Sequence, residues 1–172
     1  MNLHLGCGHR RLEGYTHIDS RPEVHPDIVA DVTDLAHLPD GCAGIVYACH
    51  VLEHVARPEV PMVLEEWRRV LRPGGILRLS VPDFAVLARL YVEQGVSLWR
   101  LIGPLMGRQD RAWNTHRSAY DYEYLAWEMT LAGYIHVWRW EPDEVLPDGY
   151  DDYSRATING VAISLNVEGV AL

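Results

Sequence analysis

The chain has 172 residues, a hydrophobic share of 48% and a charged share of 23%, a composition typical of one globular domain with its own core. All 15 positive charges are arginines, so the chain lacks the lysine that Schiff-base enzymes and Walker-type phosphate loops require. The formal net charge of −9 argues against nucleic acids as partners, because their binding depends on positive side chains that neutralise phosphates.

Cysteine usage and hydropathy indicate which compartment and which kinds of site to expect. The three cysteines, Cys7, Cys42 and Cys49, form no C-x-x-C pair, so the sequence predicts neither a disulfide framework nor a zinc site, and we expect no metal. We see no basic-then-apolar leader and no apolar run of about 18 residues. A cytoplasmic protein with reduced thiols and no membrane contact is therefore expected.

Short apolar or alternating segments predict seven strands, at residues 2–5, 15–18, 27–30, 45–49, 76–81, 134–140 and 161–170. Helical spacing predicts helices at 58–71, from Pro82-Asp83 to Gly95, and at 97–106 and 121–131. Strands that alternate with helices pair in parallel, whereas the last two strands lack a crossover helix and should pair antiparallel. The sequence thus predicts one α/β domain over residues 1–172, a doubly wound, mostly parallel seven-stranded sheet with an antiparallel last strand.

Residues suited to ligand binding follow the first three predicted strands. The turn Leu5-Gly6-Cys7-Gly8 follows the first strand, and its glycines let the backbone pass close to a ligand. Asp19 ends the second strand and suits two adjacent ribose hydroxyls. Asp31 follows the third strand. Its side chain could accept a hydrogen bond from an adenine amino group, next to the backbone of Val32, or it could cap a helical turn. Ligands of open α/β sheets bind at these carboxyl ends, so the three features indicate one shared site.

Two later segments are more specific: His50-Val51-Leu52-Glu53-His54-Val55 after the fourth strand, and Arg69-Val70-Leu71-Arg72-Pro73-Gly74-Gly75 before the fifth. With the earlier motifs they resemble, in the right order over residues 2–83, the class I methyltransferases that depend on S-adenosyl-L-methionine (SAM), in their small-molecule branch. The resemblance implies a Rossmann-like methyltransferase fold and SAM as cofactor. It implies that Leu5, Gly6, Cys7 and Gly8 approach the methionine part of SAM, Asp19 the ribose, Asp31 and Val32 the adenine, and His50 the sulfonium.

Two features depart from that family. His4 stands near the place where the family usually has an acidic residue. The helix between the first two strands, and the helical cap before the first, are short or missing. We therefore expect a cofactor that is more exposed than usual or is covered by a partner chain, and a homodimer is one arrangement that would cover it.

Methyl transfer is an in-line displacement in which positioning supplies much of the rate, and a general base helps when the acceptor is a hydroxyl or an ammonium group. The expected catalytic residues are His116, His50 and Asp83. The expected acceptor-binding residues are Trp113, His116, Arg117 and Tyr120, in or near a polar loop outside the cofactor motifs. Glu53 and His54 are expected to be structural, and most of the six tryptophans to fill the core, since the chain has one Phe.

The sequence therefore predicts a SAM-dependent methyltransferase that acts on a small polar molecule, on an oxygen atom. One alternative is a SAM-binding or partner-regulating module with weak catalysis. A second is a nicotinamide-dependent oxidoreductase, which the spacing disfavours. Arg11 stands where G-x-G-x-x-G needs its third glycine, and 11 residues separate Gly8 from Asp19, where dinucleotide folds have about twenty.

Overall fold

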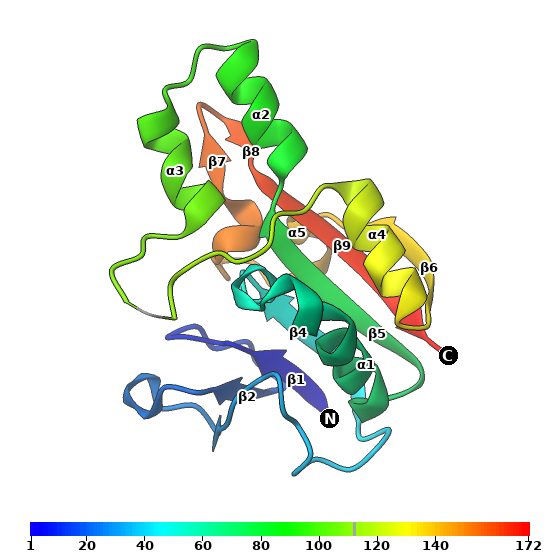
Figure 1. Cartoon of the computed structure of the whole chain (residues 1–172). Helices are drawn as coiled ribbons and strands as arrows, with labels where there is room; N and C mark the ends of the chain where they lie inside the picture. The colour runs from blue at the N-terminus through cyan, green and yellow to red at the C-terminus, as the bar shows by residue number, and fades with distance from the viewer. Residues whose placement is uncertain (112) are drawn as a thin grey trace.

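The computed structural model describes residues 1–111 and 113–172. Its centre is a seven-stranded sheet with the order β3-β2-β1-β4-β5-β9-β6 (Figure 1). The strands are β1 (Asn2–Leu5), β2 (Tyr15–Asp19), β3 (Ile28–Val29), β4 (Ala43–Cys49), β5 (Leu71–Pro82), β6 (Tyr134–Arg139) and β9 (Ser164–Ala171). Neighbouring strands are parallel except at β9, which runs antiparallel to both β5 and β6. The predicted fold class is confirmed.

The last predicted strand, at 161–170, differs in detail. The chain first forms a separate two-stranded hairpin of β7 (Thr157–Ile158) and β8 (Val161–Ala162), and β9 begins only after Ile163. Asn159 and Gly160 form the turn with φ angles of 53° and 76°, the left-handed conformation that two-residue hairpin turns require. An Asn-Gly pair between two short apolar segments is the sequence signal for this hairpin.

Two helices, α1 (Val60–Val70) and α4 (Tyr122–Leu131), lie side by side over one face of the sheet (Figure 1). The alternate strand residues that point to this face are aliphatic and fully buried, for example Leu5, Val46 and Leu79. Each such side chain contributes about 1.5–3 kcal/mol through burial. The 3-10 turn η3 (Arg57–Glu59) precedes α1, so the regular helix begins two residues later than predicted.

The opposite face of the sheet has a thinner cover. Residues 6–14, between β1 and β2, contain no helix, as the sequence predicts. Instead, the Arg11 guanidinium donates to the backbone carbonyls of Gly8, Arg10, Val24 and His25, and so ties this connection to the segment after β2. The four-residue helix α5 (Pro142–Val145) and its following loop cover the centre of this face.

Beyond the carboxyl ends of β4 and β5, the helices α2 (Phe84–Val92) and α3 (Leu98–Met106) stand with the β7–β8 hairpin as a separate layer at the top of Figure 1. They share a second, smaller core, to which Leu87, Leu101 and Ile163 belong. The loop from α3 to α4 returns from this layer towards β1 and β2, which brings residues 113–117 over the strand ends (Figure 1).

The expectation for the tryptophans is wrong. Trp67 and Trp140 are buried, but Trp99, Trp113, Trp127 and Trp138 are exposed, and Trp99 is 86% accessible. The core is filled instead by aliphatic side chains and by tyrosines such as Tyr47 and Tyr134.

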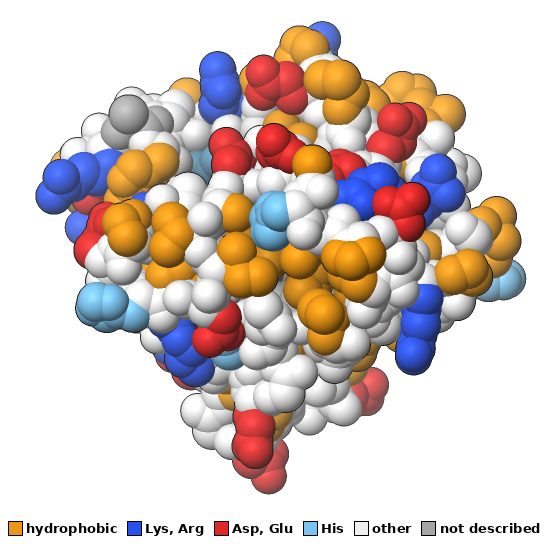
Figure 2. Space-filling view, turned by 90° about the horizontal axis from the view of Figure 1, so that it is seen from below, with side chains coloured by type: hydrophobic (Ala, Val, Ile, Leu, Met, Phe, Trp, Pro, Cys, Tyr) orange, Lys and Arg blue, Asp and Glu red, His pale blue; other side chains and the backbone are white. Residues whose placement is uncertain are grey.

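None of the described helices combines the length and the hydrophobicity that a transmembrane helix requires. On the face shown in Figure 2, arginines stand singly among acidic side chains and do not gather in one broad field. This face therefore lacks the continuous positive surface that tracks a nucleic-acid backbone.

Candidate functional site

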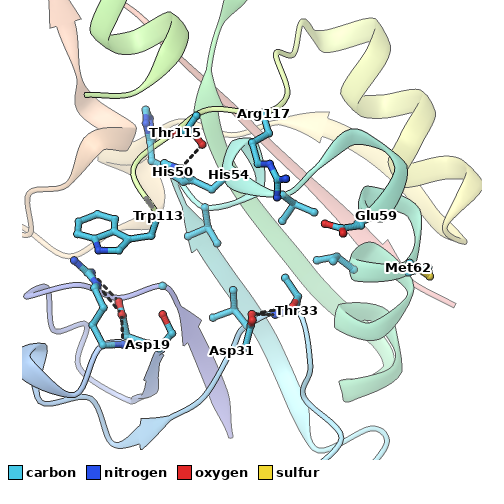
Figure 3. Close-up of a pocket in the computed structure, with 17 residues that line it drawn as sticks. Asp19, Asp31, Thr33, His50, His54, Glu59, Met62, Trp113, Thr115 and Arg117 are labelled. Carbon is cyan, nitrogen blue, oxygen red and sulfur yellow. Dashed lines mark hydrogen bonds and ion pairs between the residues drawn. The ribbon is translucent and has the colours of Figure 1, made fainter. Parts of the chain in front are cut away.

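A cavity of about 1000 Å³ lies at the carboxyl ends of β1, β2, β3 and β4 (Figure 3). The strand order reverses between β1 and β4, and ligands of doubly wound sheets bind at such a point. One side of the cavity is lined by residues that follow the strand ends. The other side is lined by the segment after β4, by the start of α1 and by the loop between α3 and α4.

The Gly-rich turn forms the floor next to β1. Gly6 lines the cavity with a φ of +61°, and a Cβ there would lie 2.5 Å from Cγ2 of Val51, so the position accepts only glycine. Gly8 lies behind the cavity wall, where its N–H donates to Oδ2 of Asp19 over 2.8 Å. Leu5 and Cys7 are buried beneath the turn. Of the four residues predicted here, Gly6 reaches the cavity, and Gly8 acts through Asp19.

Asp19 lines the cavity at the end of β2 and is only 3% exposed. Its carboxylate accepts four hydrogen bonds, from the N–H of Gly8 and from the N–H, Nε and Nη2 of Arg21. Burial by itself raises the pKa of Asp19, but these hydrogen bonds outweigh it and hold the pKa below its usual value. The Arg21 guanidinium also lies 4.5 Å from the ring centre of Trp113 and joins β2 to the loop after α3 (Figure 3).

Asp31 and Val32 line the cavity after β3. Oδ1 of Asp31 accepts hydrogen bonds from the N–H and the hydroxyl of Thr33, so Asp31 caps this turn. The same residue also lines the cavity. The carbonyl of Val32 accepts from Nε1 of Trp67 in α1 over 2.7 Å, which anchors this turn to the helical layer. Asp31 and Thr33 are both exposed, so this end of the cavity opens at the surface.

His50 lines the cavity directly after β4, at the predicted place. Its φ is +53°, a conformation that costs energy in a residue other than glycine. The chain holds it there because the His50 N–H donates to the Ser80 carbonyl, while its Nε2 lies 2.9 Å from Oγ of Ser164. Burial lowers the pKa of His50 to about 3, so this imidazole is neutral near pH 7.

The far side of the cavity contains residues that the sequence reasoning did not assign to it. His54 comes from the 3-10 turn η2 (Leu52–His54), Glu59 and Met62 from the start of α1, and Thr115 from the loop after α3. Figure 3 shows Arg117 on the same side. The sequence carries no signal for Glu59 and Met62, because facing the cavity depends on how α1 is seated on the sheet.

Backbone contacts hold this loop against the η2 turn. The N–H groups of Arg117 and Ser118 both donate to the Glu53 carbonyl, over 2.7 and 3.2 Å. The Ser118 hydroxyl donates to the carbonyl of Val55. Residues 115–118 are therefore fixed on the segment that lines the cavity after β4.

Three of the residues predicted for catalysis or acceptor binding do not line the cavity. Asp83 caps α2 by accepting from the N–H of Val86 over 3.2 Å, and it lies 3.7 Å from Arg139. Tyr120 is buried and stacks on Tyr124. His116 lies behind the wall, beside His54, with ring centres 4.8 Å apart. Trp113 and Arg117, by contrast, line the cavity as predicted.

Sequence comparison finds related proteins for the first half of the chain. A family model described as a methyltransferase domain matches residues 3–79. A curated relative, an uncharacterized 37.1 kDa protein in transposon TN4556 of Streptomyces fradiae, is 39% identical over 79 residues. The alignment covers 45% of this chain and 22% of that protein, so the chain spans only a minor part of that relative.

Solved structures share the fold over almost the whole chain. A SAM-dependent methyltransferase from Methanosarcina mazei is 19% identical, with a TM-score of 0.62, over 99% of this chain and 91% of that one. A SAM-dependent methyltransferase from Thermotoga maritima is 14% identical, with a TM-score of 0.58, over 99% and 82%. The protein bound to the Haloferax volcanii Trm112 methyltransferase activator is 17% identical, with a TM-score of 0.59, over 98% and 81%.

Residues 3–79 thus match a methyltransferase domain, and almost the whole chain shares the fold of solved SAM-dependent methyltransferases. SAM is therefore the cofactor that the family implies, and the cavity fits it. The two neighbouring side-chain donors of Arg21 bind the Asp19 carboxylate as the two hydroxyls of a ribose would. The cavity volume of about 1000 Å³ also accommodates a ligand of this size together with a small acceptor.

Proposed function

We propose that this methyltransferase domain transfers the methyl group of SAM to a small polar acceptor, on an oxygen atom. The observation that carries the proposal is the continuity of the cavity. Asp19 and Arg117 line opposite sides of the same space, which His50 also lines (Figure 3). A cofactor half and an acceptor half that meet at one residue are what an in-line transfer requires.

In the cofactor half, Asp19 binds the ribose hydroxyls after Arg21 has moved away. Asp31 and Val32 bind the adenine at the exposed end, and the backbone at Gly6 passes beside the methionine part. Leu5, Cys7 and Gly8 support this turn. SAM, when bound, supplies an electrophilic methyl group on its sulfonium, and His50 is the residue we place beside it.

In the acceptor half, Arg117 offers a positive charge, Thr115 and Glu59 offer hydrogen bonds, and Met62 offers an apolar surface. This mixture suits a small molecule that combines hydroxyl groups with a negative charge. Trp113 lines the cavity beside Asp19 and offers a flat surface for stacking (Figure 3).

The histidines contribute position more than proton transfer. Burial lowers the pKa of His50 to about 3 and that of His116 to about 4, too low for an effective general base at neutral pH. We therefore attribute the expected rate enhancement mainly to orientation of the acceptor. His50 is a neutral side chain that lines the cavity and can form hydrogen bonds there. The capping role of Asp83 in α2 gives it a structural function instead.

A second candidate function, a module that needs a partner chain for full activity, is favoured by one observation. One protein with this fold is bound to a methyltransferase activator, and here the adenine end of the cavity is exposed. An added chain, or a second copy in a homodimer, would cover that end. Light scattering of the purified protein, with and without S-adenosylhomocysteine (SAH), tests the homodimer directly.

Calorimetric titration with SAH and, separately, with NAD tests the cofactor assignment. We expect SAH to bind and NAD not to bind. Asp19→Ala should weaken SAH binding by about 1.5–3 kcal/mol, tenfold or more. Asp148→Ala, in an exposed loop, is the matched control and should leave binding unchanged. Binding of neither ligand, or of NAD alone, would overturn the proposal.

Labelled SAM and a panel of small hydroxylated acids and phosphates then test the acceptor class. We expect turnover with members of this panel, and we expect Arg117→Ala to raise the KM for the acceptor while SAH affinity stays unchanged. Transfer only to nitrogen acceptors would refute methylation on oxygen. Loss of SAH binding in Arg117→Ala would refute the division of the cavity into two halves.

A further inference from the structure

Four side chains that can bind a cation meet behind the acceptor half of the cavity. Glu53 and His54 come from the η2 turn, His116 comes from the loop after α3, and His50 borders them from the end of β4. One ligand atom each from Glu53, His54 and His116 lies within 4.8 Å of the other two. Glu53 is fully buried, and neither of its carboxylate oxygens has a hydrogen-bond partner among the described residues.

Hydrogen bonds fix the tautomers of two of these histidines. Nδ1 of His54 lies 3.2 Å from the carbonyl of Thr115, and Nδ1 of His116 lies 3.0 Å from the carbonyl of Pro104. A carbonyl oxygen only accepts, so both Nδ1 atoms carry the proton. The Nε2 atoms are then left with free lone pairs. A second nitrogen that donates to a backbone carbonyl is also the usual support of a metal-binding histidine.

The third histidine adds another lone pair. The Ser164 hydroxyl donates its one proton to the carbonyl of Tyr153 over 2.6 Å, so it accepts from Nε2 of His50. Nδ1 of His50 is then unprotonated and faces Oε1 of Glu53 at 3.3 Å. Two acceptor atoms at this distance require a proton or a cation near them.

We propose that Glu53, His54 and His116 bind one divalent first-row transition metal, with Nδ1 of His50 as an adjoining fourth ligand. Two ligands of such a metal, each about 2.0–2.2 Å from it, lie about 3–4 Å apart. The distance of 4.0 Å from Nε2 of His116 to Oε1 of Glu53 fits this separation. The three ligand atoms all lie within 4.8 Å of one another, so small side-chain movements bring them into this range.

The donor set selects the kind of metal. Imidazole nitrogens suit zinc, cobalt, nickel and iron, whereas magnesium prefers an all-oxygen shell and retains several waters. Glu53 supplies the one negative charge, and its burial leaves little room for a hydrated ion. With Glu53, His54 and His116 bound, a tetrahedral metal keeps one position open, which either Nδ1 of His50 or an outside ligand can take.

The place of the site suggests a use for the open position, and this part rests on the proposed function. His54 and Thr115 line the cavity in its acceptor half, so a metal held by His54 lies at the wall where the acceptor binds. The acceptor group that suits the open position is a hydroxyl or carboxylate oxygen. Such a ligand would fix the acceptor relative to His50.

The sequence predicted no metal because the ligands have no recognised spacing. Glu53 and His54 are consecutive, and His116 follows 62 residues after His54 in sequence number. Adjacent residues on a regular helix or strand do not point to one place, and only the 3-10 turn after β4 brings both side chains towards His116.

The test uses untagged full-length protein that has been treated with a chelator and desalted. Zn²⁺ titrated by calorimetry should bind with a stoichiometry of one per chain at micromolar or tighter affinity. Co²⁺ should give the visible d–d absorption of a nitrogen- and oxygen-ligated ion. Glu53→Gln and His116→Gln should each weaken binding by at least about tenfold. His37→Gln and His136→Gln, which remove exposed histidines, are the matched controls and should not change it.

Each result bears on the metal site separately from the methyltransferase assignment, since SAH titration of the same samples reports the cofactor site. An anomalous scattering peak between Glu53, His54 and His116 in Co²⁺-loaded crystals would support the proposal even where a variant fails to fold. No stoichiometric binding would overturn it and leave a proton as the cation on Glu53. Equal loss in the His37→Gln control, or displacement of Zn²⁺ by millimolar Mg²⁺, would also overturn it.

Discussion

Removing the Arg21 side chain should strengthen cofactor binding. A carboxylate offers about four lone-pair sites. In this structure Asp19 already accepts four hydrogen bonds, two of them from the Arg21 guanidinium over 2.9 and 3.0 Å. Two ribose hydroxyls can bind the same oxygens only after that guanidinium leaves. If Asp19 binds the ribose as we propose, Arg21 competes with the cofactor for its carboxylate.

The size of the effect follows from the environment of the pair. The side chain of Asp19 is 4% exposed and that of Arg21 is 25% exposed, so solvent partly screens the ion pair. A fully exposed pair contributes about 0.2–1 kcal/mol and a hydrogen bond to a charged group about 1.5–3 kcal/mol. We take about 1 kcal/mol for the two-point contact, so Arg21→Ala should lower the Kd for SAH about fivefold.

Calorimetry of SAH binding at low and moderate salt measures this change. Trp113→Ala should act in the same direction with a smaller effect, because it removes a cation–π contact worth about 0.5–1 kcal/mol from the closed position of Arg21. Asp19→Ala must act in the opposite direction. If Arg21→Ala instead weakens SAH binding, then Arg21 contacts the ligand, and the competition argument is wrong.

Three further changes test other parts of the structure. Gly6→Ala should abolish SAH binding and lower the melting temperature, because its Cβ would lie 2.5 Å from Val51 in a left-handed conformation; calorimetry and thermal melting measure both. Arg11→Ala should lower the melting temperature by about 2–8 °C, because it removes four hydrogen bonds to backbone carbonyls. The control Arg10→Ala removes only an exposed ion pair at 3.6 Å and should have little effect. Equal shifts in the two variants would contradict the structural role of Arg11. In metal-free protein, burial raises the pKa of Glu53 to about 8, above its unfolded value of about 4.3, so the folded state binds the extra proton and this group's contribution to stability should fall as pH rises between these values. Buried histidines such as His50 and His116, whose pKa values are lowered, add a slope of opposite sign to both wild type and Glu53→Gln. Urea unfolding at pH 5 and pH 8 should therefore show the unfolding free energy of the wild type falling relative to that of Glu53→Gln as pH rises.

The sequence predicts which residues line the cavity at the strand ends better than which residues line its far side, for a physical reason. Asp19, Asp31 and His50 each follow a buried parallel strand, and parallel strands bring their carboxyl ends to one edge of the sheet. Hydrophobic pattern alone therefore places these residues together. Glu59 and Met62 face the cavity because of the seating of α1, which no local pattern encodes.

Side-chain partners were the least predictable feature. In the sequence, Arg11 indicates only a departure from a dinucleotide motif. In the structure its guanidinium connects the segment after β1 to the segment after β2, where no helix is present in residues 6–14. Glu53 was expected to be structural, but it is a fully buried carboxylate without a hydrogen-bond partner among the described residues. Both outcomes depend on which segments the fold brings together over long sequence separations.

The short segment after β4 links the two halves of the cavity. His50, in its left-handed conformation, turns the chain so that His50 and Val51 line the cofactor half, while His54, four residues after His50, lines the acceptor half. The carbonyl of Glu53 meanwhile anchors the acceptor loop through the N–H of Arg117. On the proposed division of the cavity, we therefore expect a substitution within this segment to disturb cofactor binding and acceptor binding together. Changes of acceptor specificity are accordingly expected at Met62 and in residues 113–117, where a side chain can change without moving the backbone that supports the cofactor.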